Sequence, residues 1–471
     1  MITPNHNLTL EQMDRQSLIH PFTNLKDHAS GKLQDFPIIT EGNGIRVRDQ
    51  NGRWFIDAFA GLYCVNIGYG RREVVDAIHE QARKLAFFHI NTGHSNEPAA
   101  RLADRLVRMG PGNISKVFFG VSGSDANDTS VKLVWYYNNA IGRPKKKKIV
   151  GRDRGYHGGT VMGSSLSGLS VIHKGFDLPI GPVRHTVAPH YYWGAEPGMS
   201  ERQFSRHCAE ALDELIVTEG PETVAAFIAE PVMGTGGIVP PPEGYWDEIQ
   251  FVLRRHEVML IADEIVCAFG RLGYQFGSER YALEPDLITL AKGITSGYVP
   301  LSASLLSERI WRGLEQGADV YGPFAHTLTY AAHPLGAAAA MANLDVIEKD
   351  GLIAYARAVG DYLQERLHVV FGGHPMVGEV RGVGLLGAVE FVADRKNKTR
   401  FDANLGIGRR VAAECREEGV IVRPMPGGDT MGFSPPLVIT KPEIDDMLER
   451  CARALSRVTD ALTREIGWKG S

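Results

Sequence analysis

The chain has 471 residues, of which 44% are hydrophobic and 23% charged, with a formal net charge of -4. This length is enough for one or two large α/β units, and the charge balance excludes a polybasic surface for nucleic acid or an anionic membrane. The five cysteines are scattered without CxxC spacing, which favours a reducing, cytoplasmic compartment and argues against a disulfide framework or a zinc site.

The N-terminal part predicts a short helix followed by a β meander. A helix is expected over residues 8–20, with Thr9 as its N-cap and Pro21 at its end. No long apolar stretch accompanies it, so neither a signal peptide nor a membrane-spanning helix is expected. Asp49-Gln50-Asn51-Gly52 lies between two β-rich runs and predicts a hairpin, and helical periodicity follows over 72–85.

Helices alternate with short apolar runs between about residues 100 and 330. The runs lie at 117–119, 149–150, 225–228, 259–261 and 287–290. Runs that are apolar on both faces are typical of a buried parallel sheet flanked by helices. The basic run Lys145–Lys148 precedes one of these strands, and we expect it to be a solvated loop edge and not a nucleic-acid patch.

The C-terminal third predicts a second, smaller α+β unit. A helix of small residues is expected from 335 to about 347, a β-rich run over 384–392 and a closing helix over 443–466. We therefore expect a large domain over residues 76–332. The smaller domain would be built from both chain ends, residues 1–75 and 333–471, with no linker marking the boundary.

Two of the expected strands end in residues that suit an aromatic aldehyde cofactor. One apolar run ends at Asp263, and the other ends just before Lys292. A carboxylate can hold a ring nitrogen as its cation, and an amine can condense with an aldehyde as a Schiff base. Strands that end in Asp or Lys are common in α/β proteins, so this pair alone leaves a structural role open.

Further segments supply other parts of such a site. Ser122, Gly123 and Ser124 begin a helix, where free N–H groups bind phosphate, although a plain N-cap gives the same pattern. Tyr156-His157 and Glu230 follow other strands, at the edge where α/β folds place ligands. His326 and His333 are seven residues apart, which is no metal-ligand spacing, and we expect no metal site.

Taken in order, these segments resemble the class III (ω-type) aminotransferases of fold type I, over nearly the whole chain. The resemblance rests on segments 61–70, 122–127, 155–158, 263–266, 270–271, 291–293, 329–330 and 333–334. It implies an α/β fold with a large domain around a mostly parallel sheet and a smaller α+β domain. It also implies pyridoxal 5'-phosphate (PLP) as cofactor, and a homodimer or dimer of dimers whose sites are completed across the interface.

The resemblance implies a role for each matching residue. Lys292 would carry the cofactor and move a proton, and Asp263 would keep the pyridine nitrogen protonated. Arg423 resembles a mobile arginine that pairs with a substrate carboxylate, the alternative being a structural salt bridge. The other implied cofactor contacts are Ser122, Gly123, Ser124, Tyr156, His157, Glu230, Val266 and Thr329, the last from a partner subunit, and the other implied substrate contacts are Tyr63, Phe88 and Tyr156.

The implied reaction moves an amino group from a small-molecule amine or ω-amino acid to a keto acid through pyridoxamine phosphate. Val266 favours pyruvate as the acceptor, because members that act on 4-aminobutyrate or ornithine tend to have Gln there. A PLP-dependent decarboxylase or aminomutase of the same fold is the alternative, since it would share every cofactor residue. A third hypothesis is a binding protein that has lost catalysis, which the presence of Lys292 and Asp263 disfavours.

Overall fold

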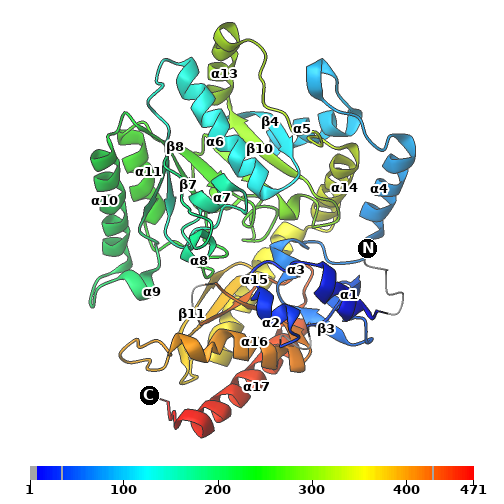
Figure 1. Ribbon diagram of the computed structural model, residues 1–471, viewed down its shortest axis with the longest axis vertical. Helices are drawn as coiled ribbons and strands as arrows, with labels where there is room; N and C mark the ends of the chain where they lie inside the picture. The colour runs from blue at the N-terminus through cyan, green and yellow to red at the C-terminus, as the bar shows by residue number, and fades with distance from the viewer. Residues whose placement is uncertain (1–7, 33–35, 427–428, 471) are drawn as a thin grey trace.

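The computed structural model describes residues 8–32, 36–426 and 429–470. Figure 1 shows the middle of the chain in the upper half of the molecule and segments from both chain ends together in the lower half. No described helix combines the length and the apolar character needed to cross a bilayer.

A seven-stranded sheet forms the centre of the upper half. The strand order is β4 (Ile114–Gly120), β10 (Ser302–Ser307), β9 (Leu287–Leu290), β8 (Met259–Asp263), β7 (Val224–Ala229), β5 (Lys148–Arg152) and β6 (Val183–Thr186). Five neighbouring strands, β9, β8, β7, β5 and β6, run parallel to one another. The strand β10 runs antiparallel to both of its neighbours, β9 and β4.

The predicted sheet is confirmed, with one correction. The run 117–119 lies in β4, which pairs antiparallel with β10 and has no parallel neighbour. The strand β10 itself is missing from the prediction, because Ser302, Ser304 and Ser307 break up its apolar character. These serines are nevertheless buried, and Ser304 donates from its hydroxyl to the Ala126 carbonyl at 2.9 Å, which satisfies the polar group.

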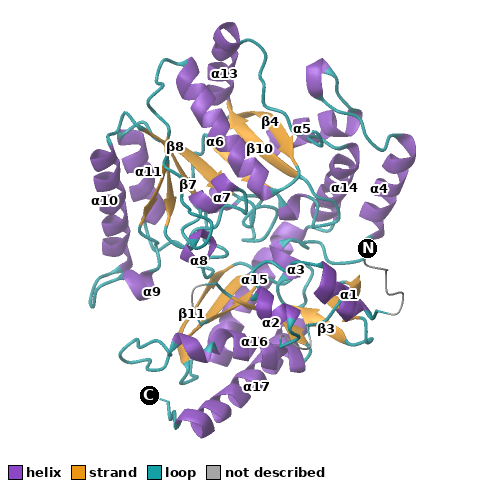
Figure 2. Ribbon diagram, in the orientation of Figure 1, coloured by secondary structure: helices purple, strands orange, loops and turns teal. Residues whose placement is uncertain are grey.

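Helices pack against both faces of this sheet, as Figure 2 shows. Their starts follow local capping chemistry: Ser122 caps α6 and Ser200 caps α10, each in a reciprocal capping box. The helices of this half are α4 (Arg72–Lys84), α5 (Glu97–Met109), α6 (Gly123–Ala140), α7 (Val161–Leu166), α8 (Ser170–His173), α9 (Tyr191–Gly194), α10 (Glu201–Glu219), α11 (Tyr245–Arg255), α12 (Gly277–Arg280), α13 (Glu308–Tyr321) and α14 (Pro334–Lys349).

Two four-stranded sheets form the lower half. One has the order β1 (Ile39–Asn43), β2 (Arg46–Asp49), β3 (Trp54–Asp57) and β13 (Val420–Ile421), and the other β11 (Val377–Val383), β12 (Leu386–Phe391), β15 (Thr430–Phe433) and β14 (Arg423–Pro424). The helices are α1 (Leu10–Ser17), α2 (Leu25–Ala29), α3 (Ala60–Tyr63), α15 (Leu352–Phe371), α16 (Ile407–Glu417) and α17 (Lys441–Ile466). The predicted hairpin and the Thr9 cap are confirmed. The predicted domain limits remain a prediction.

The basic run before β5 differs from its prediction as a solvated loop edge. Lys146 is only 5% exposed, and its ammonium donates to the carbonyls of His256 at 3.1 Å and Glu257 at 2.8 Å. Lys148 forms an ion pair with Glu219 at 2.7 Å. Two of these lysines therefore hold the start of β5 in place. A count of charges along the sequence does not reveal this role.

The parallel strands β5, β7 and β8 end at Arg152, Ala229 and Asp263, on one edge of the sheet. Side chains that follow these ends converge there, because parallel strands share the position of their carboxyl ends. This edge faces the lower half of the molecule and positions the site described next.

Candidate active site

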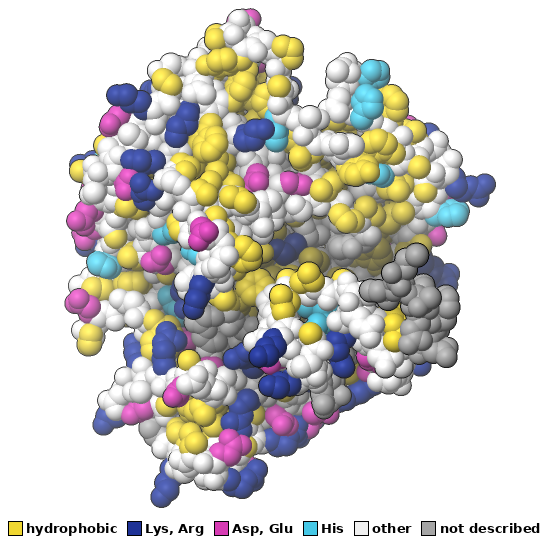
Figure 3. All heavy atoms as spheres, viewed as in Figure 1, with side chains coloured by type: hydrophobic (Ala, Val, Ile, Leu, Met, Phe, Trp, Pro, Cys, Tyr) yellow, Lys and Arg dark blue, Asp and Glu magenta, His cyan; other side chains and the backbone are white. Residues whose placement is uncertain are grey.

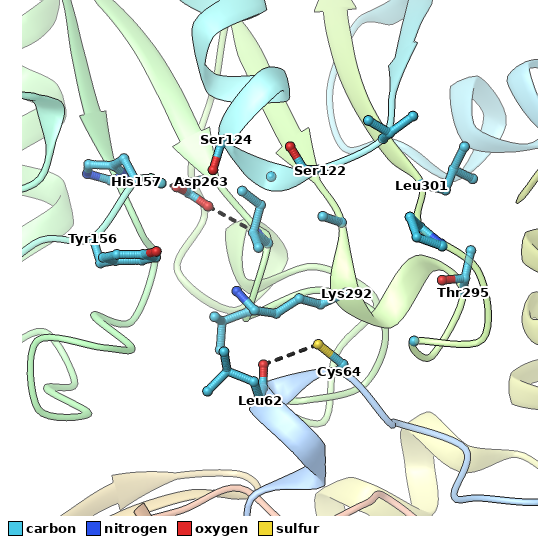
Figure 4. Close-up of a pocket in the computed structure, with 18 of the residues that line it drawn as sticks. Leu62, Cys64, Ser122, Ser124, Tyr156, His157, Asp263, Lys292, Thr295 and Leu301 are labelled. Carbon is cyan, nitrogen blue, oxygen red and sulfur yellow. Dashed lines mark hydrogen bonds and ion pairs between the residues drawn. The ribbon is translucent and has the colours of Figure 1, made fainter. Parts of the chain in front are cut away.

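A cavity of about 340 Å³ lies at this carboxyl edge. Figure 4 shows Tyr156, Asp263 and Lys292 facing the same space, with Ser122 and Ser124 at the start of α6 above them. The predicted cofactor residues that line the cavity are Ser122, Gly123, Ser124, Tyr156, His157, Glu230, Asp263, Val266 and Lys292.

Three groups form hydrogen bonds with the side chain of Asp263. Its Oδ2 accepts the Asn127 amide at 2.9 Å and lies 2.8 Å from Nδ1 of His157, and its Oδ1 accepts the Ile265 N–H at 3.2 Å. Since a carboxylate only accepts, Nδ1 of His157 carries the proton of that hydrogen bond. One lone pair of Oδ1 remains for a further donor, which suits the protonated nitrogen of an aromatic ring.

Lys292 lies at the bottom of the cavity, directly after β9 and Ala291. Its Nζ is 5.9 Å from the ring centroid of Tyr63 and has no hydrogen-bond partner among the described residues. Burial lowers the pKa of the Lys292 ammonium below its ordinary value, although Cys64 and Asp263 oppose that shift. A lowered pKa gives a larger fraction of neutral amine, the form that attacks an aldehyde. The backbone of Lys292 is also left-handed, with φ +44°.

The start of α6 offers two backbone donors to an anion. The Asp125 carboxylate already accepts the N–H groups of Val121 and Ser122, whereas those of Gly123 and Ser124 have no acceptor among the described residues. Small residues keep this corner open: a Cβ on Gly158 would lie 2.6 Å from the Ser124 hydroxyl. Free N–H groups at a helix start bind phosphate, so this corner fits the phosphate of the expected cofactor.

Glu230 does not compete with Asp263 for a ring cation, because Glu230 has a cation of its own. Its Oε2 accepts from the guanidinium of Arg152 at 2.9 Å, and Oε1 accepts the Tyr156 N–H at 3.3 Å. Arg152 is 1% exposed and lies over the ring of Trp246. The pair therefore fixes the start of the Tyr156 loop and places Tyr156 beside the cavity.

Two predicted substrate residues lie just outside the cavity lining. Tyr63 is 1% exposed, and burial raises the pKa of its hydroxyl above the ordinary value. The Arg423 guanidinium lies 5.6 Å and 5.9 Å from the ring centroids of Phe59 and Tyr63, and its charge opposes the rise in the pKa of Tyr156. No carboxylate of the described residues pairs with Arg423, so the salt-bridge alternative has no partner in this part of the chain.

The other two predicted residues lie on the surface. Phe88 is 39% exposed and stacks on His89. Thr329 is exposed and does not line the cavity of its own chain. The structure thus brings nine predicted residues together, puts Tyr63 and Arg423 next to them, and leaves Phe88 and Thr329 exposed on the surface.

Three residues at the site carry no role in the sequence prediction. Asn127 belongs to the segment 122–127, and it lies one helical turn after Gly123 and therefore faces the same edge. Arg152 is the last residue of the buried strand β5, and its role depends on its contact with Glu230. Cys64 lines the cavity, and its thiol donates to the Leu62 carbonyl at 3.2 Å. No sequence signal marked Cys64.

Comparison with known protein families supplies the assignment. The family model described as aminotransferase class-III matches residues 28–455. The chain belongs to the class III aminotransferase family. It is accordingly a fold type I enzyme that uses PLP and moves an amino group from a small-molecule donor to a keto-acid acceptor.

Related proteins and solved structures match this chain over most of its length. A diaminobutyrate–2-oxoglutarate transaminase of Halomonas elongata is 54% identical, over 96% of this chain and 97% of its own. A mitochondrial gamma aminobutyrate transaminase of Solanum lycopersicum is 42% identical, over 91% and 83%. An omega transaminase from Pseudomonas jessenii, solved in complex with PMP, has a TM-score of 0.94 at 41% identity and covers 98% of this chain and 100% of its own.

Proposed function

We propose that this aminotransferase accepts amines and ω-amino acids as donors and pyruvate as acceptor, with Lys292 and Asp263 at its reacting centre. The observation that carries the proposal is the shared cavity of Lys292, Asp263 and Tyr156 beside two free backbone donors. The residues present fit PLP: a carboxylate with a vacant lone pair, a buried amine, a flat ring and an anion corner.

Bound PLP supplies a conjugated ring that delocalises the negative charge left when the substrate Cα loses its proton. Asp263 keeps a proton on the ring nitrogen, and Asn127 and His157 hold the carboxylate in place for this role. Lys292 takes the proton from the substrate Cα with its neutral Nζ, which its lowered pKa favours. Tyr156 and Val266 would cover the two faces of the ring, and the free N–H groups of Gly123 and Ser124 would bind the phosphate.

The donor and acceptor follow from the cavity wall and from Arg423. Leu62, Tyr156 and Val266 make much of the wall apolar, which suits an uncharged amine substituent. Arg423, free of any described carboxylate, is available for the carboxylate of an ω-amino acid or of pyruvate. The rival acceptor is 2-oxoglutarate, supported by the name of the Halomonas elongata relative.

One set of assays tests these roles. Lys292→Ala should abolish both turnover and the visible absorbance of lysine-bound cofactor, while the wild type consumes amine with pyruvate in equal amounts. An active or normally coloured K292A would contradict the role of Lys292. Faster turnover with 2-oxoglutarate than with pyruvate would overturn the acceptor, and carbon dioxide release without a keto acid would indicate a decarboxylase.

The exposed apolar residues support a homodimer. Phe87, Phe88, Tyr321, Phe324 and Tyr330 are each between 37% and 58% exposed, and we call this set the aromatic surface. Figure 3 shows hydrophobic side chains gathered over the upper half of this face of the molecule. Large exposed apolar patches mark interaction sites. Thr329 lies next to Tyr330 in the chain, so it would belong to the same interface, which agrees with the partner role that the resemblance implies for it.

The cysteines support a reducing, cytoplasmic location as part of this proposal. All five are free thiols, and four of them are buried. Burial raises the pKa of Cys208 to about 12, which keeps that thiol protonated and unreactive.

A further inference from the structure

Three potential metal ligands meet at the N-terminus, far from the cofactor residues in the chain. Asp14 lies in α1, His20 follows that helix, and His28 lies in α2. Nε2 of His20 is 2.9 Å from Oδ2 of Asp14, and Nε2 of His28 is 3.7 Å from the same oxygen. One ligand atom from each residue lies within 4.8 Å of the other two.

These separations suit a tetrahedral metal ion. Zinc binds imidazole nitrogen and carboxylate oxygen at about 2.0–2.2 Å, so neighbouring ligand atoms of a tetrahedron lie about 3.3–3.5 Å apart. The two measured separations, 2.9 Å and 3.7 Å, lie on either side of that value. The ligand atoms of His20 and His28 lie within 4.8 Å of each other, so side-chain rotations that close this distance would place all three atoms around one ion.

His28 gives an independent indication. Its Nε2 is buried and has no hydrogen-bond partner, since 3.7 Å to Asp14 is too long for a hydrogen bond. A buried nitrogen without a partner costs free energy, and a metal ion would satisfy it. The His28 side chain is 16% exposed and that of Asp14 26%, whereas that of His20 is 37% exposed, so an ion has access from solvent.

The two helices also need a stabilising contact. α1 has eight residues, α2 has five, and neither contains a buried residue. Helices this short are marginal without packing. A metal held by one residue of α1, one of α2 and one of the connection between them would join the two helices directly.

The charges around the three ligands are balanced, so the ligand atoms themselves select the ion. Glu11, Asp27 and Glu417 line the same hollow as the three ligands, and so do Arg15, Arg53 and Arg416. Opposite charges are therefore mixed around the three ligands. Two neutral imidazoles and one carboxylate form a nitrogen-rich set, which selects zinc over calcium or magnesium.

We propose that Asp14, His20 and His28 form a binding site for Zn²⁺ that joins α1 to α2. This site differs from the expectation of no metal site, which rested on the spacing of His326 and His333 and on the scattered cysteines. The ligand spacings here, six and eight residues, match no familiar zinc motif. A water molecule would complete the fourth position, since three protein ligands leave one coordination site open.

The test uses tag-free holoenzyme, treated with a chelator and then dialysed against metal-free buffer. Isothermal titration with zinc chloride should show one site per chain with a Kd of about 1 µM or tighter. His28→Ala, His20→Ala and Asp14→Asn should each weaken this site by at least about 10-fold. His79→Ala is the matched control, because His79 is an exposed histidine on α4 and should change nothing.

Limited proteolysis gives a second measurement that does not depend on catalysis. Zinc should slow cleavage between α1 and α2 in the wild type and in H79A, but not in H28A. The proposal is overturned if the wild type shows no saturable site tighter than about 100 µM. It is also overturned if H28A binds zinc as tightly as the wild type, since the ion would then lie elsewhere.

Discussion

Asp263 receives three hydrogen bonds and Glu230 receives two, and the partners differ in kind. The donors to Asp263 are an amide, an imidazole and a backbone N–H, so none of them brings an obligatory positive charge. Glu230 is paired with the permanently charged Arg152. In the proposed function, the two carboxylates on this edge of the sheet thus have separate roles: Asp263 would hold a ring cation, whereas Glu230 pairs with Arg152 of the protein itself.

Asp263→Asn should reduce kcat by at least about 100-fold and weaken cofactor binding. A neutral amide cannot form an ion pair with a protonated ring nitrogen, and its NH₂ group would face the hydrogen-bond donors of Asn127 or His157. Steady-state rates and the cofactor absorbance spectrum measure the effect. Asp286→Asn is the control, because Asp286 accepts the Leu260 N–H at the opposite end of β8 and pairs with Arg309. Equal losses in both variants would contradict the role of Asp263.

Glu264 predicts a pH-dependent stability. Its side chain is fully buried and accepts from the Gly277 N–H and the Ser278 N–H and hydroxyl, and burial raises its pKa from 4.5 to about 7. The folded chain then binds more protons than the unfolded chain between these two pKa values. Stability from this group is therefore lost as the pH rises through that window, by about 3 kcal/mol at most.

Glu264→Gln removes this titration. The melting temperature of the variant, relative to the wild type, should rise between about pH 5 and about pH 8. Calorimetry at several pH values measures it, and the comparison cancels the other titrating groups. A difference that stays constant over this range would show that Glu264 does not titrate there.

At the scale of elements, the phosphate corner depends on how closely the loop after β5 approaches α6. Gly158 has φ +134° and lies against Ser124. A Cβ added to Gly158 would lie 2.8 Å from the Ser124 Cα. Because the Ser124 Cα is a backbone atom, it cannot move away from an added Cβ as the end of a flexible side chain could. The two free N–H groups at the start of α6 are therefore positioned by a contact that only glycine permits.

Gly158→Ala should weaken PLP binding by about 10- to 100-fold, because strain of about 1–3 kcal/mol would push the loop and the helix apart. Gly159→Ala is a closely matched control, since a Cβ on the neighbouring Gly159 meets nothing within 4 Å. Fluorescence titration of the apoenzyme with PLP gives both dissociation constants. Similar constants for the two variants would contradict the importance of this contact.

The elements that the sequence predicted share strong local signals. The Thr9 and Ser122 caps and the Asn51-Gly52 turn are encoded by a few adjacent residues, and the structure confirms them. β10 has alternating serines whose partners lie on α6, so no local pattern reveals that it is buried. The roles of Arg152 and Asn127 are absent from the sequence prediction for the same reason, because both depend on contacts with residues far away in the sequence.

At the scale of the whole molecule, the proposed dimer explains why Thr329 and Phe88 match the family and yet lie outside the cavity of their own chain. Burying the aromatic surface between two copies would remove a large apolar area from water. Phe87 already contacts Tyr330, with ring centroids 5.5 Å apart, so the two loops present one continuous surface.

Tyr330→Asp should weaken the dimer by at least about 100-fold, because a charge would be buried without a partner. Phe251→Asp is the control, since Phe251 is 61% exposed on α11, compared with 58% for Tyr330, and lies outside the aromatic surface. Sedimentation velocity at several concentrations measures the association. A Y330D protein that remains as dimeric as F251D would place the interface elsewhere.

The pairing of β3 with β13 bears on how the chain is made. Ile56 pairs with Val420 in parallel register, so the partner of β3 is synthesised long after β3 itself. The strands of the seven-stranded sheet all lie between these two segments and are completed first. Until then β3 has an unpaired edge, which is a site for association with other chains. The sheet that contains β3 can therefore be completed only after every strand of the seven-stranded sheet has been made.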